Sequence, residues 1–253
     1  MKRIRIVHWI GMIIMTPALL AAEAPAVPSA VEQFDTKSVW LYTGNSDKKL
    51  DFSHYFSHNT DEAYTNWKIH FPLGKIEEIQ ELDTEFNIVA ARKAYDVWKK
   101  TGYEYMVEDT SLGVVGVTGM EGVDENGVRI KWVQETIRKN IARFIGKKAV
   151  FRVSIAQVDV GIIRVYTGIV KGVICAPRGQ KGFGFDDFFQ PSDQLYQAGG
   201  KYKTLAEMKE TQGPHKWDQW NARALAIALY KAPAYTQSYS VAEIEAISPL
   251  VWQ

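Results

Sequence analysis

Six residues in the first half of the chain have the types and order of a phosphate-binding turn. Thr43-Gly44-Asn45 follows a short β-rich run, and Ser46 and Asp47 are residue types that often begin helices. A glycine turn leading into a helix presents free N–H groups and the positive end of the helix dipole, to which Lys48 adds a full charge. The segment indicates a phosphate cradle, and an ordinary turn with a solvated lysine has the same pattern.

Two adjacent acidic residues, Glu108 and Asp109, follow a short predicted strand. Carboxylates that face one opening can hold Mg²⁺, a hard cation that prefers oxygen ligands and keeps several waters. Such an ion bridges phosphate oxygens, and a carboxylate beside it can orient or deprotonate an attacking water. Glu78, in an acidic segment, is a candidate further ligand. The competing interpretation is a solvated acidic turn in which Asp109 caps the next segment.

A glycine-rich loop at 178–186 carries two phenylalanines, Phe183 and Phe185, separated by Gly184 and followed by Asp186. Aromatic rings in such a loop can stack on a nucleobase, which contributes about 1–3 kcal/mol per base. Anchoring of the loop in the core by the same two rings is the alternative.

The apolar spacing predicts the elements that must position these loops. Alternation predicts strands at 39–42, 66–71, 103–107, 149–157 and 162–173, the last two joined by a turn at 159–161. Helical spacing and helix-start signals predict helices over 48–56, 84–100, 133–144 and 221–231, and Ser240 with Glu243 predicts a capping box for a last helix. The mixture predicts an α/β or α+β fold with a sheet at its core.

Composition excludes several classes of protein. The 253 residues are 46% hydrophobic and 23% charged, which excludes a disordered chain and a multi-span membrane protein. The formal net charge of +1 gives no sign of a nucleic-acid-binding surface. Cys175 is the single cysteine, so an internal disulfide and any multi-cysteine metal site are excluded.

The first 22 residues have the pattern of a secretory signal peptide. Lys2, Arg3 and Arg5 precede an apolar run that ends in small residues at 21–22. The run is shorter than the roughly 20 residues that a membrane-spanning helix needs, so we expect cleavage, export to the periplasm or the exterior, and no lasting membrane insertion. An uncleaved anchor and a start codon further along the chain are the alternatives. Residues 23–37 are expected to form a tether.

Seven segments, in order along the chain, resemble the inosine triphosphate pyrophosphatase family. The matched segments are Thr43-Gly44-Asn45 with Lys48, Glu78-Ile79-Gln80, 89–94 with Lys93, 107–112 around Glu108-Asp109-Thr110, Ile130-Lys131-Trp132, 176–189 with Phe183 and Phe185, and 204–208. Each motif alone is weak, but seven in sequence make chance similarity remote.

The resemblance implies an α/β fold with a long, twisted mixed sheet flanked by helices, in two lobes around a central cleft, and a homodimer. It implies a Mg²⁺-dependent enzyme that converts a nucleoside triphosphate and water to the monophosphate and pyrophosphate. Asp109, with Glu108, would be catalytic, and Glu78 and Asp109 would hold Mg²⁺. The substrate-binding residues would be Thr43, Asn45, Lys48, Lys93, Thr110, Phe183, Gly184, Phe185, Asp186, Trp220 and Asn221. The family domain would span 38–232, leaving 233–253 as a C-terminal extension.

The chain departs from the family where the base is read. Alignment at Arg223-Ala224-Leu225 puts Gln219-Trp220-Asn221 where the family has Ser-His-Arg. Tryptophan offers one N–H and a stacking face but no positive charge, so the base preference is open. His215 or Lys216 stands near the family's lysine, Glu81 rivals Glu78 as a metal ligand, and 119–129 forms a longer loop.

These departures, together with export, keep two other functions open. One is a catalytically idle protein that binds a nucleotide or a partner on the same fold. The other is a phosphohydrolase that acts on a non-nucleotide phosphate ester.

Overall fold

The structure of the protein is a computed structural model that describes residues 38–57, 67–73, 86–115, 130–192, 202–211, 218–232 and 234–247, with only the backbone of 130–133. The chain divides into residues 1–35 and a compact unit of residues 36–253, and all described residues lie in the second. The predicted signal peptide, the tether and the candidate ligands Glu78 and Glu81 lie outside the described residues.

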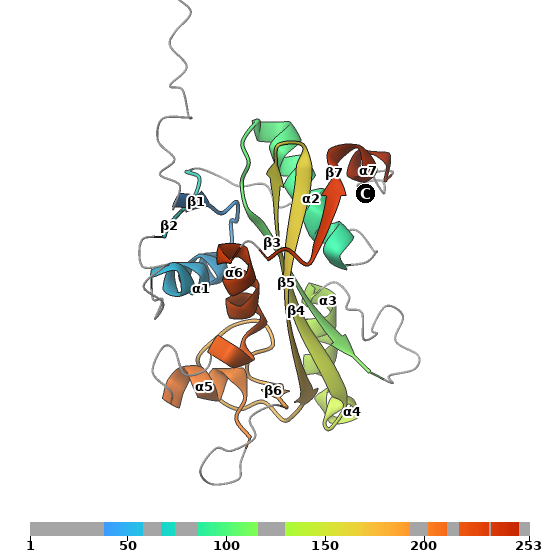
Figure 1. Ribbon diagram of the computed structural model, residues 1–253. Helices are drawn as coiled ribbons and strands as arrows, with labels where there is room; N and C mark the ends of the chain where they lie inside the picture. The colour runs from blue at the N-terminus through green and yellow to red at the C-terminus, as the bar shows by residue number, and fades with distance from the viewer. Residues whose placement is uncertain are drawn as a thin grey trace, which may run out of the picture. The chain divides into compact units, whose positions relative to one another are not determined.

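A five-stranded antiparallel sheet forms the centre of this unit (Figure 1). Its strands are β3 (Val107–Val114), β4 (Lys148–Asp159), β5 (Ile162–Ile174), β6 (Phe189–Pro191) and β7 (Gln237–Ser240). The order is β3-β4-β5-β6, and β7 pairs with β5. The predicted hairpin of β4 and β5 is confirmed, with Val160 (φ 47°) and Gly161 (φ 76°) at its turn.

Two short parallel strands make the fold mixed. β1 (Ser38–Trp40) pairs with β2 (Lys68–His70), and Leu41 forms a parallel bridge with Met106 just before β3. The predicted α/β class, with a sheet flanked by helices, is confirmed. The two lobes with a central cleft stay a prediction.

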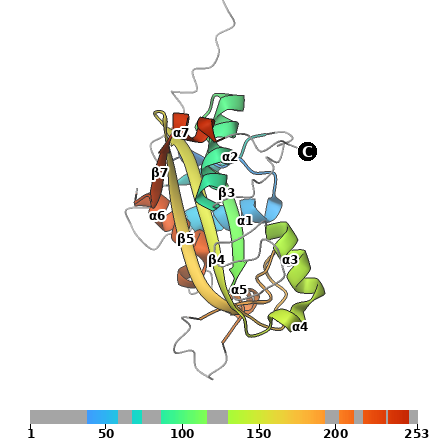
Figure 2. The same ribbon diagram turned by 90° about the vertical axis from the view of Figure 1, so that its right-hand side faces the viewer.

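Helices cover both faces of the sheet (Figures 1 and 2). α1 (Ser46–Ser57), α5 (Leu205–Thr211) and α6 (Ala222–Lys231) pack on one face, while α2 (Phe86–Thr101) and α7 (Val241–Ala246) pack on the other. α3 (Ile130–Lys139), α4 (Ile141–Phe144) and the 3₁₀ turn η3 (Asp218–Trp220) complete the described elements. The single helix predicted over 133–144 is thus two helices that meet at Asn140.

Glycine at 168 lets α6 approach the sheet closely. A Cβ atom at Gly168 would lie 2.0 Å from the carbonyl oxygen of Ala222 and 2.6 Å from the nitrogen of Ala226. Contacts this short are far inside van der Waals distance, so the position of α6 depends on a residue without a side chain.

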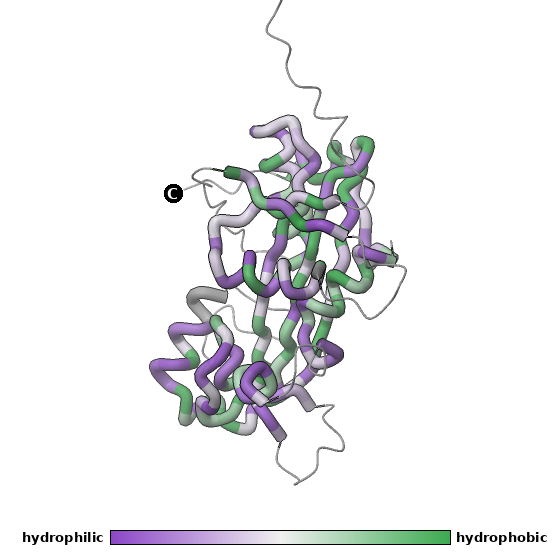
Figure 3. Tube along the Cα trace, turned by 90° about the vertical axis from the view of Figure 1, so that its left-hand side faces the viewer, coloured by the Kyte–Doolittle hydropathy of each residue, from purple (hydrophilic) through white to green (hydrophobic). Residues whose placement is uncertain are grey.

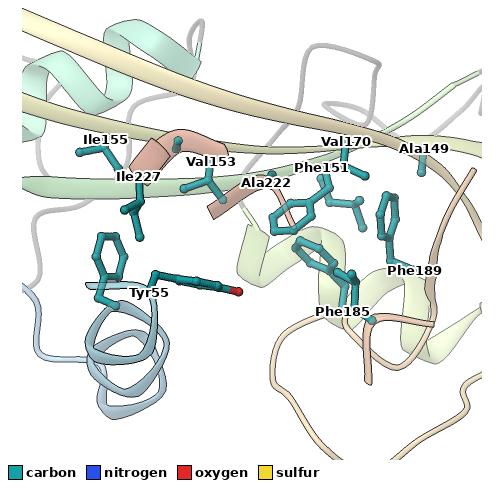
Figure 4. Close-up of a cluster of buried hydrophobic side chains, with 14 of the residues drawn as sticks. Tyr55, Ala149, Phe151, Val153, Ile155, Val170, Phe185, Phe189, Ala222 and Ile227 are labelled. Atoms are coloured by element: carbon teal, nitrogen blue, oxygen red, sulfur yellow. The ribbon is translucent and has the colours of Figure 1, made fainter. Parts of the chain in front are cut away.

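The core has one cluster on each face of the sheet, because alternate strand residues point to opposite faces. Hydrophobic residues recur along the central strands in Figure 3. The larger cluster joins β4 and β5 to α1, α5 and α6, and Phe151, Phe185 and Phe189 lie together in it (Figure 4). The smaller cluster joins α2 to the sheet through Ala90, Ala94 and Val165.

The segment 234–247, part of the predicted C-terminal extension of the family domain, packs on the sheet. β7 adds a strand to the sheet, and Ile244 of α7 is buried in the smaller cluster. The predicted capping box is confirmed, since Ser240 and Glu243 bond reciprocally. Among the described residues, no helix is both long and apolar enough to cross a membrane.

Candidate functional site

The first candidate loop leaves the sheet where β1 ends. The N–H of Tyr42 donates to the carbonyl of Met106 (2.8 Å), so the chain runs beside the start of β3 before it turns into α1. From Val107 onward, β3 pairs only with β4 as far as the described residues show. Because Lys48 forms an ion pair with Glu108, the first turn of α1 lies beside β3 on the face to which Glu108 points. A crevice where a parallel strand ends and a helix begins is a common ligand site.

Thr43 and Asn45 shape this turn. The Asn45 side-chain oxygen accepts from the N–H of Lys48 (3.0 Å), and the Thr43 hydroxyl oxygen accepts from the N–H of Asn45 (3.2 Å). In these bonds the Thr43 and Asn45 side chains act only as acceptors. Thr43 also has an O–H group and Asn45 an NH₂ group that can donate. The helix start predicted from the sequence is therefore built as a capped turn with Lys48 in its first turn.

The structure corrects the prediction that Glu108 and Asp109 face one opening from a loop. Both lie inside β3, where neighbouring side chains point to opposite faces. Glu108 pairs with Lys48 of α1 on one face, and Asp109 pairs with Lys93 of α2 on the other. The predicted strand ended at 107 because polar residues follow, but pairing of 107–114 with β4 continues it.

Glu108 is buried in a group of charges. Its Oε1 accepts from Arg223 Nη2 (3.2 Å) and from the Thr110 hydroxyl, and its Oε2 pairs with Lys48. Burial by itself would raise the pKa of Glu108, but attraction to Lys48 and Arg223, with the hydrogen bonds, outweighs it and lowers the pKa from 4.5 to about 2. Glu108 is therefore a fixed anion at neutral pH and a poor proton acceptor. The Thr110 hydroxyl donates to Glu108 in this structure, and substrate binding by Thr110 stays a prediction.

Asp109 is the remaining candidate for the metal ligand and the base. It is buried, with 6% of its surface exposed, and its Oδ1 accepts from Lys93. The described residues contain no group of three His, Cys, Asp or Glu side chains placed to hold a metal. Mg²⁺ often binds through one or two carboxylates, waters and substrate phosphates, so the donor set of Asp109 with a phosphate chain fits this ion. Glu78, the other predicted ligand, lies outside the described residues.

The glycine-rich loop separates its two phenylalanines. Phe183 is half-buried, whereas Phe185 is 3% exposed and packs edge-on against Phe151, with ring centroids 4.6 Å apart. We therefore correct the prediction that both rings stack on a base: Phe185 anchors the core, as Figure 4 shows. Gly184 adopts φ +70°, which favours glycine, and its carbonyl accepts from Arg138 (2.9 Å).

Asp186 holds the loop through two bonds. Its carboxylate accepts from the N–H of Phe183 (3.0 Å) and from Lys209 Nζ (2.9 Å). Burial raises the pKa of Asp186, and the positive charge of Lys209 offsets part of that rise. A Cβ atom at Gly182 would lie 2.4 Å from Asp186 Oδ2, so the position of the Asp186 carboxylate beside the loop requires glycine at 182.

Three residues that sequence reasoning missed complete the site. Asp51 of α1 accepts from Arg223 Nη1 (2.7 Å) and pairs with Lys209 of α5 (3.4 Å). The Arg223 guanidinium and the Lys209 ammonium lie 5.1 and 5.5 Å from the centre of the Phe183 ring. In the sequence, Lys209 directly follows the 204–208 motif and Arg223 begins the segment used for the family alignment. The residues around them give no sign that either side chain is buried beside an acidic residue.

At the positions of the family's Ser-His-Arg motif, Asn221 has a structural role, and substrate contact by Trp220 stays a prediction. Asn221 is 1% exposed, and its side-chain oxygen caps α6 by accepting from the N–H groups of Arg223 (2.8 Å) and Ala224 (3.3 Å). Trp220, in η3, is partly buried against the larger cluster. We therefore correct the prediction for Asn221, since the oxygen that would meet a base edge already caps the helix. His215 and Lys216 lie outside the described residues.

Comparison with known proteins places the chain in a family. A model of the Ham1 family matches residues 39–231. An inosine triphosphate pyrophosphatase of Yarrowia lipolytica is 30% identical over 181 residues, covering 68% of this chain and 85% of the relative. A dITP/XTP pyrophosphatase of Nostoc is 30% identical over 183 residues, covering 68% and 84%.

A solved nucleoside-triphosphatase / dITP/XTP pyrophosphatase of Mycobacterium abscessus superposes with a TM-score of 0.46 at 23% identity, over 78% of this chain and 96% of that chain. The family assignment rests on the family model and on the sequence identity with the two relatives. The chain belongs to the Ham1 family.

Proposed function

We propose that this protein is a Mg²⁺-dependent nucleoside triphosphate pyrophosphatase that releases pyrophosphate and leaves the monophosphate. The observation that carries the proposal is that neighbouring residues of β3 hold two ion pairs, Glu108 with Lys48 in the first turn of α1 on one face and Asp109 with Lys93 of α2 on the other. The helix start and the two lysines would supply positive charge for a triphosphate that reaches across this part of β3, and Asp109 would face it beside Lys93. Family membership and the printed activities of the relatives support the same reaction.

In the reaction, Asp109 orients a water for attack on the α-phosphorus and accepts its proton. The new bond joins the water oxygen to the α-phosphorus, and the bond to the pyrophosphate oxygen breaks. Lys93 holds the Asp109 carboxylate and, with Lys48, stabilises negative charge on the phosphate oxygens. Asp109 and the phosphate oxygens would hold Mg²⁺, which would supply further positive charge there.

The base would stack on Phe183 alone, since Phe185 is in the core. The cations Lys209 and Arg223 lie against the same ring, and Asp186 fixes the loop beside it. The relatives carry the names inosine triphosphate pyrophosphatase and dITP/XTP pyrophosphatase, and the bases of these substrates bear a 6-oxo group. We therefore expect a purine substrate with a 6-oxo group.

Pyrophosphate release tests the proposal directly. The purified protein is assayed with Mg²⁺ against ITP, XTP, dITP and the common triphosphates, with and without a chelator. Asp109→Asn should lower kcat by about 10²–10⁴-fold, as expected for loss of a general base. Asp96→Asn is the matched control, because Asp96 also pairs with a cation (Arg92, 3.0 Å) but lies on α2 outside the site.

The other outcomes identify the rival functions. A protein that binds a triphosphate but releases pyrophosphate from none of them would favour the catalytically idle binding protein. The replacement of the Ser-His-Arg motif is what motivates this alternative. Hydrolysis of simple phosphate esters that is insensitive to Phe183→Ala would favour the non-nucleotide phosphohydrolase. Activity that survives Asp109→Asn would refute the mechanism.

Export and dimer formation are part of the proposal. The basic and apolar pattern of residues 1–22 supports a signal peptide, and mass spectrometry of the exported protein should find an N-terminus near residue 22 or 23. The resemblance supports a homodimer, which light scattering of the mature protein would detect as about twice the chain mass.

A further inference from the structure

Arg223 lies where α6 meets both α1 and β3. Its side chain is 3% exposed, with Nη1 donating to Asp51 (2.7 Å) and Nη2 donating to both Glu108 and Thr110 (3.2 Å each). The planar fork of a guanidinium can serve two carboxylates at once, which a lysine ammonium on a single stem does less well. The rings of Phe183 and Phe52, 5.1 and 6.0 Å from the guanidinium, fix it in place.

Glu108 therefore has two cations with different freedom to move. Arg223 is buried and held by three polar partners, whereas the Lys48 side chain is 20% exposed and lies in the first turn of α1. A buried carboxylate must keep a positive charge and hydrogen bonds near it. Arg223 and Thr110 supply both at Oε1, so Glu108 keeps a positive charge and two hydrogen bonds when Lys48 leaves, and only its buried Oε2 loses a partner.

We propose that Arg223 is a positioning residue that frees Lys48 for the substrate, an inference that rests on the proposed triphosphate reaction. Without substrate, Lys48 pairs with Glu108. When the triphosphate arrives, the Lys48 ammonium moves to a phosphate oxygen, and Arg223 with Thr110 continues to neutralise Glu108. Glu108 is then a resting partner for Lys48 and not a proton acceptor.

Binding of inorganic tripolyphosphate, measured by titration calorimetry without added metal, tests this step apart from base recognition and catalysis. In Arg223→Met, Lys48 is the main remaining cation on Glu108 and should stay there. We expect affinity for tripolyphosphate to fall by about tenfold or more, the usual worth of one charge-assisted hydrogen bond. Arg223→Lys, which keeps one charge, should show an intermediate loss.

A second substitution separates positioning from folding. Glu108→Gln with Arg223→Met removes the anion that detains Lys48, so affinity should return to within about threefold of the starting protein. Asp51→Asn with Arg223→Met is the matched control. It removes the negative charge of Asp51, the other carboxylate that loses its arginine partner, so it should restore thermal stability but not affinity for tripolyphosphate. Lys48→Met should weaken binding strongly in the starting protein and little in Arg223→Met.

Several results would overturn the inference. They are unchanged affinity in Arg223→Met, no recovery with Glu108→Gln in a folded protein, or equal recovery with Asp51→Asn. If the starting protein binds no tripolyphosphate, the proposed triphosphate site itself fails. If it binds tripolyphosphate and hydrolyses triphosphates while Arg223→Met does so equally well, only the role of Arg223 is refuted.

Discussion

Replacement of Asn221 by alanine separates a helix cap from a base reader. The side-chain oxygen of Asn221 accepts two N–H groups at the start of α6, at 2.8 and 3.3 Å, and the residue is 1% exposed. Loss of an N-cap costs about 0.5–2 kcal/mol. Because water cannot easily reach this buried helix start, we expect the upper part of that range, about 1–2 kcal/mol.

The assay is thermal unfolding together with pyrophosphate release. For a chain of this size 1 kcal/mol corresponds to roughly 2–4 °C, so Asn221→Ala should lower Tm by about 2–8 °C. Serine also caps helices well but lacks the amide NH₂ group. Asn221→Ser should therefore keep Tm near the original value and leave the preference between ITP and ATP unchanged. A stable Asn221→Ser protein with an altered preference, or an Asn221→Ala protein with an unchanged Tm, would refute the reasoning.

Three further outcomes follow from the core and its buried groups. Phe185→Ala should lose about 3–5 kcal/mol of stability. Phe183→Ala should mainly raise KM for the nucleotide, by about 5–150-fold, because stacking is lost. Urea denaturation and steady-state kinetics on both variants check this contrast. Burial lowers the pKa of Lys231 from 10.5 to about 8, so between these pH values the unfolded chain binds the proton and the folded chain does not. Stability relative to Lys231→Met should therefore rise with pH by about 3 kcal/mol over that window, and an unchanged difference in urea denaturation would contradict it. Gly168→Ala should destabilise the protein by about 1–3 kcal/mol, because the new Cβ meets the Ala222 carbonyl at 2.0 Å; a wild-type Tm would show that α6 shifts without cost.

The sequence alone determined the features that depend on neighbouring residues. The β4–β5 hairpin and the capping box at Ser240 follow from alternation and from residue types a few positions apart. The turn from Thr43 to Lys48 was found for the same reason, since its cap joins residues three positions apart. The order of the motifs was enough to indicate the family.

Only the tertiary structure decided which side chains share a site. Glu108 and Asp109 are adjacent in sequence, yet pairing with β4 extends the strand through them and sends them to opposite faces. Phe183 and Phe185 have the same local pattern, but packing against Phe151 buries only the second.

Arg223 shows why the sequence could not give the rest. It meets Glu108 across 115 residues and Asp51 across 172, and no local spacing records contacts over such distances. Its role depends on burial, because the same arginine on a solvated helix face would be screened by water. The close approach of α6 to β5 at Gly168 creates that buried environment.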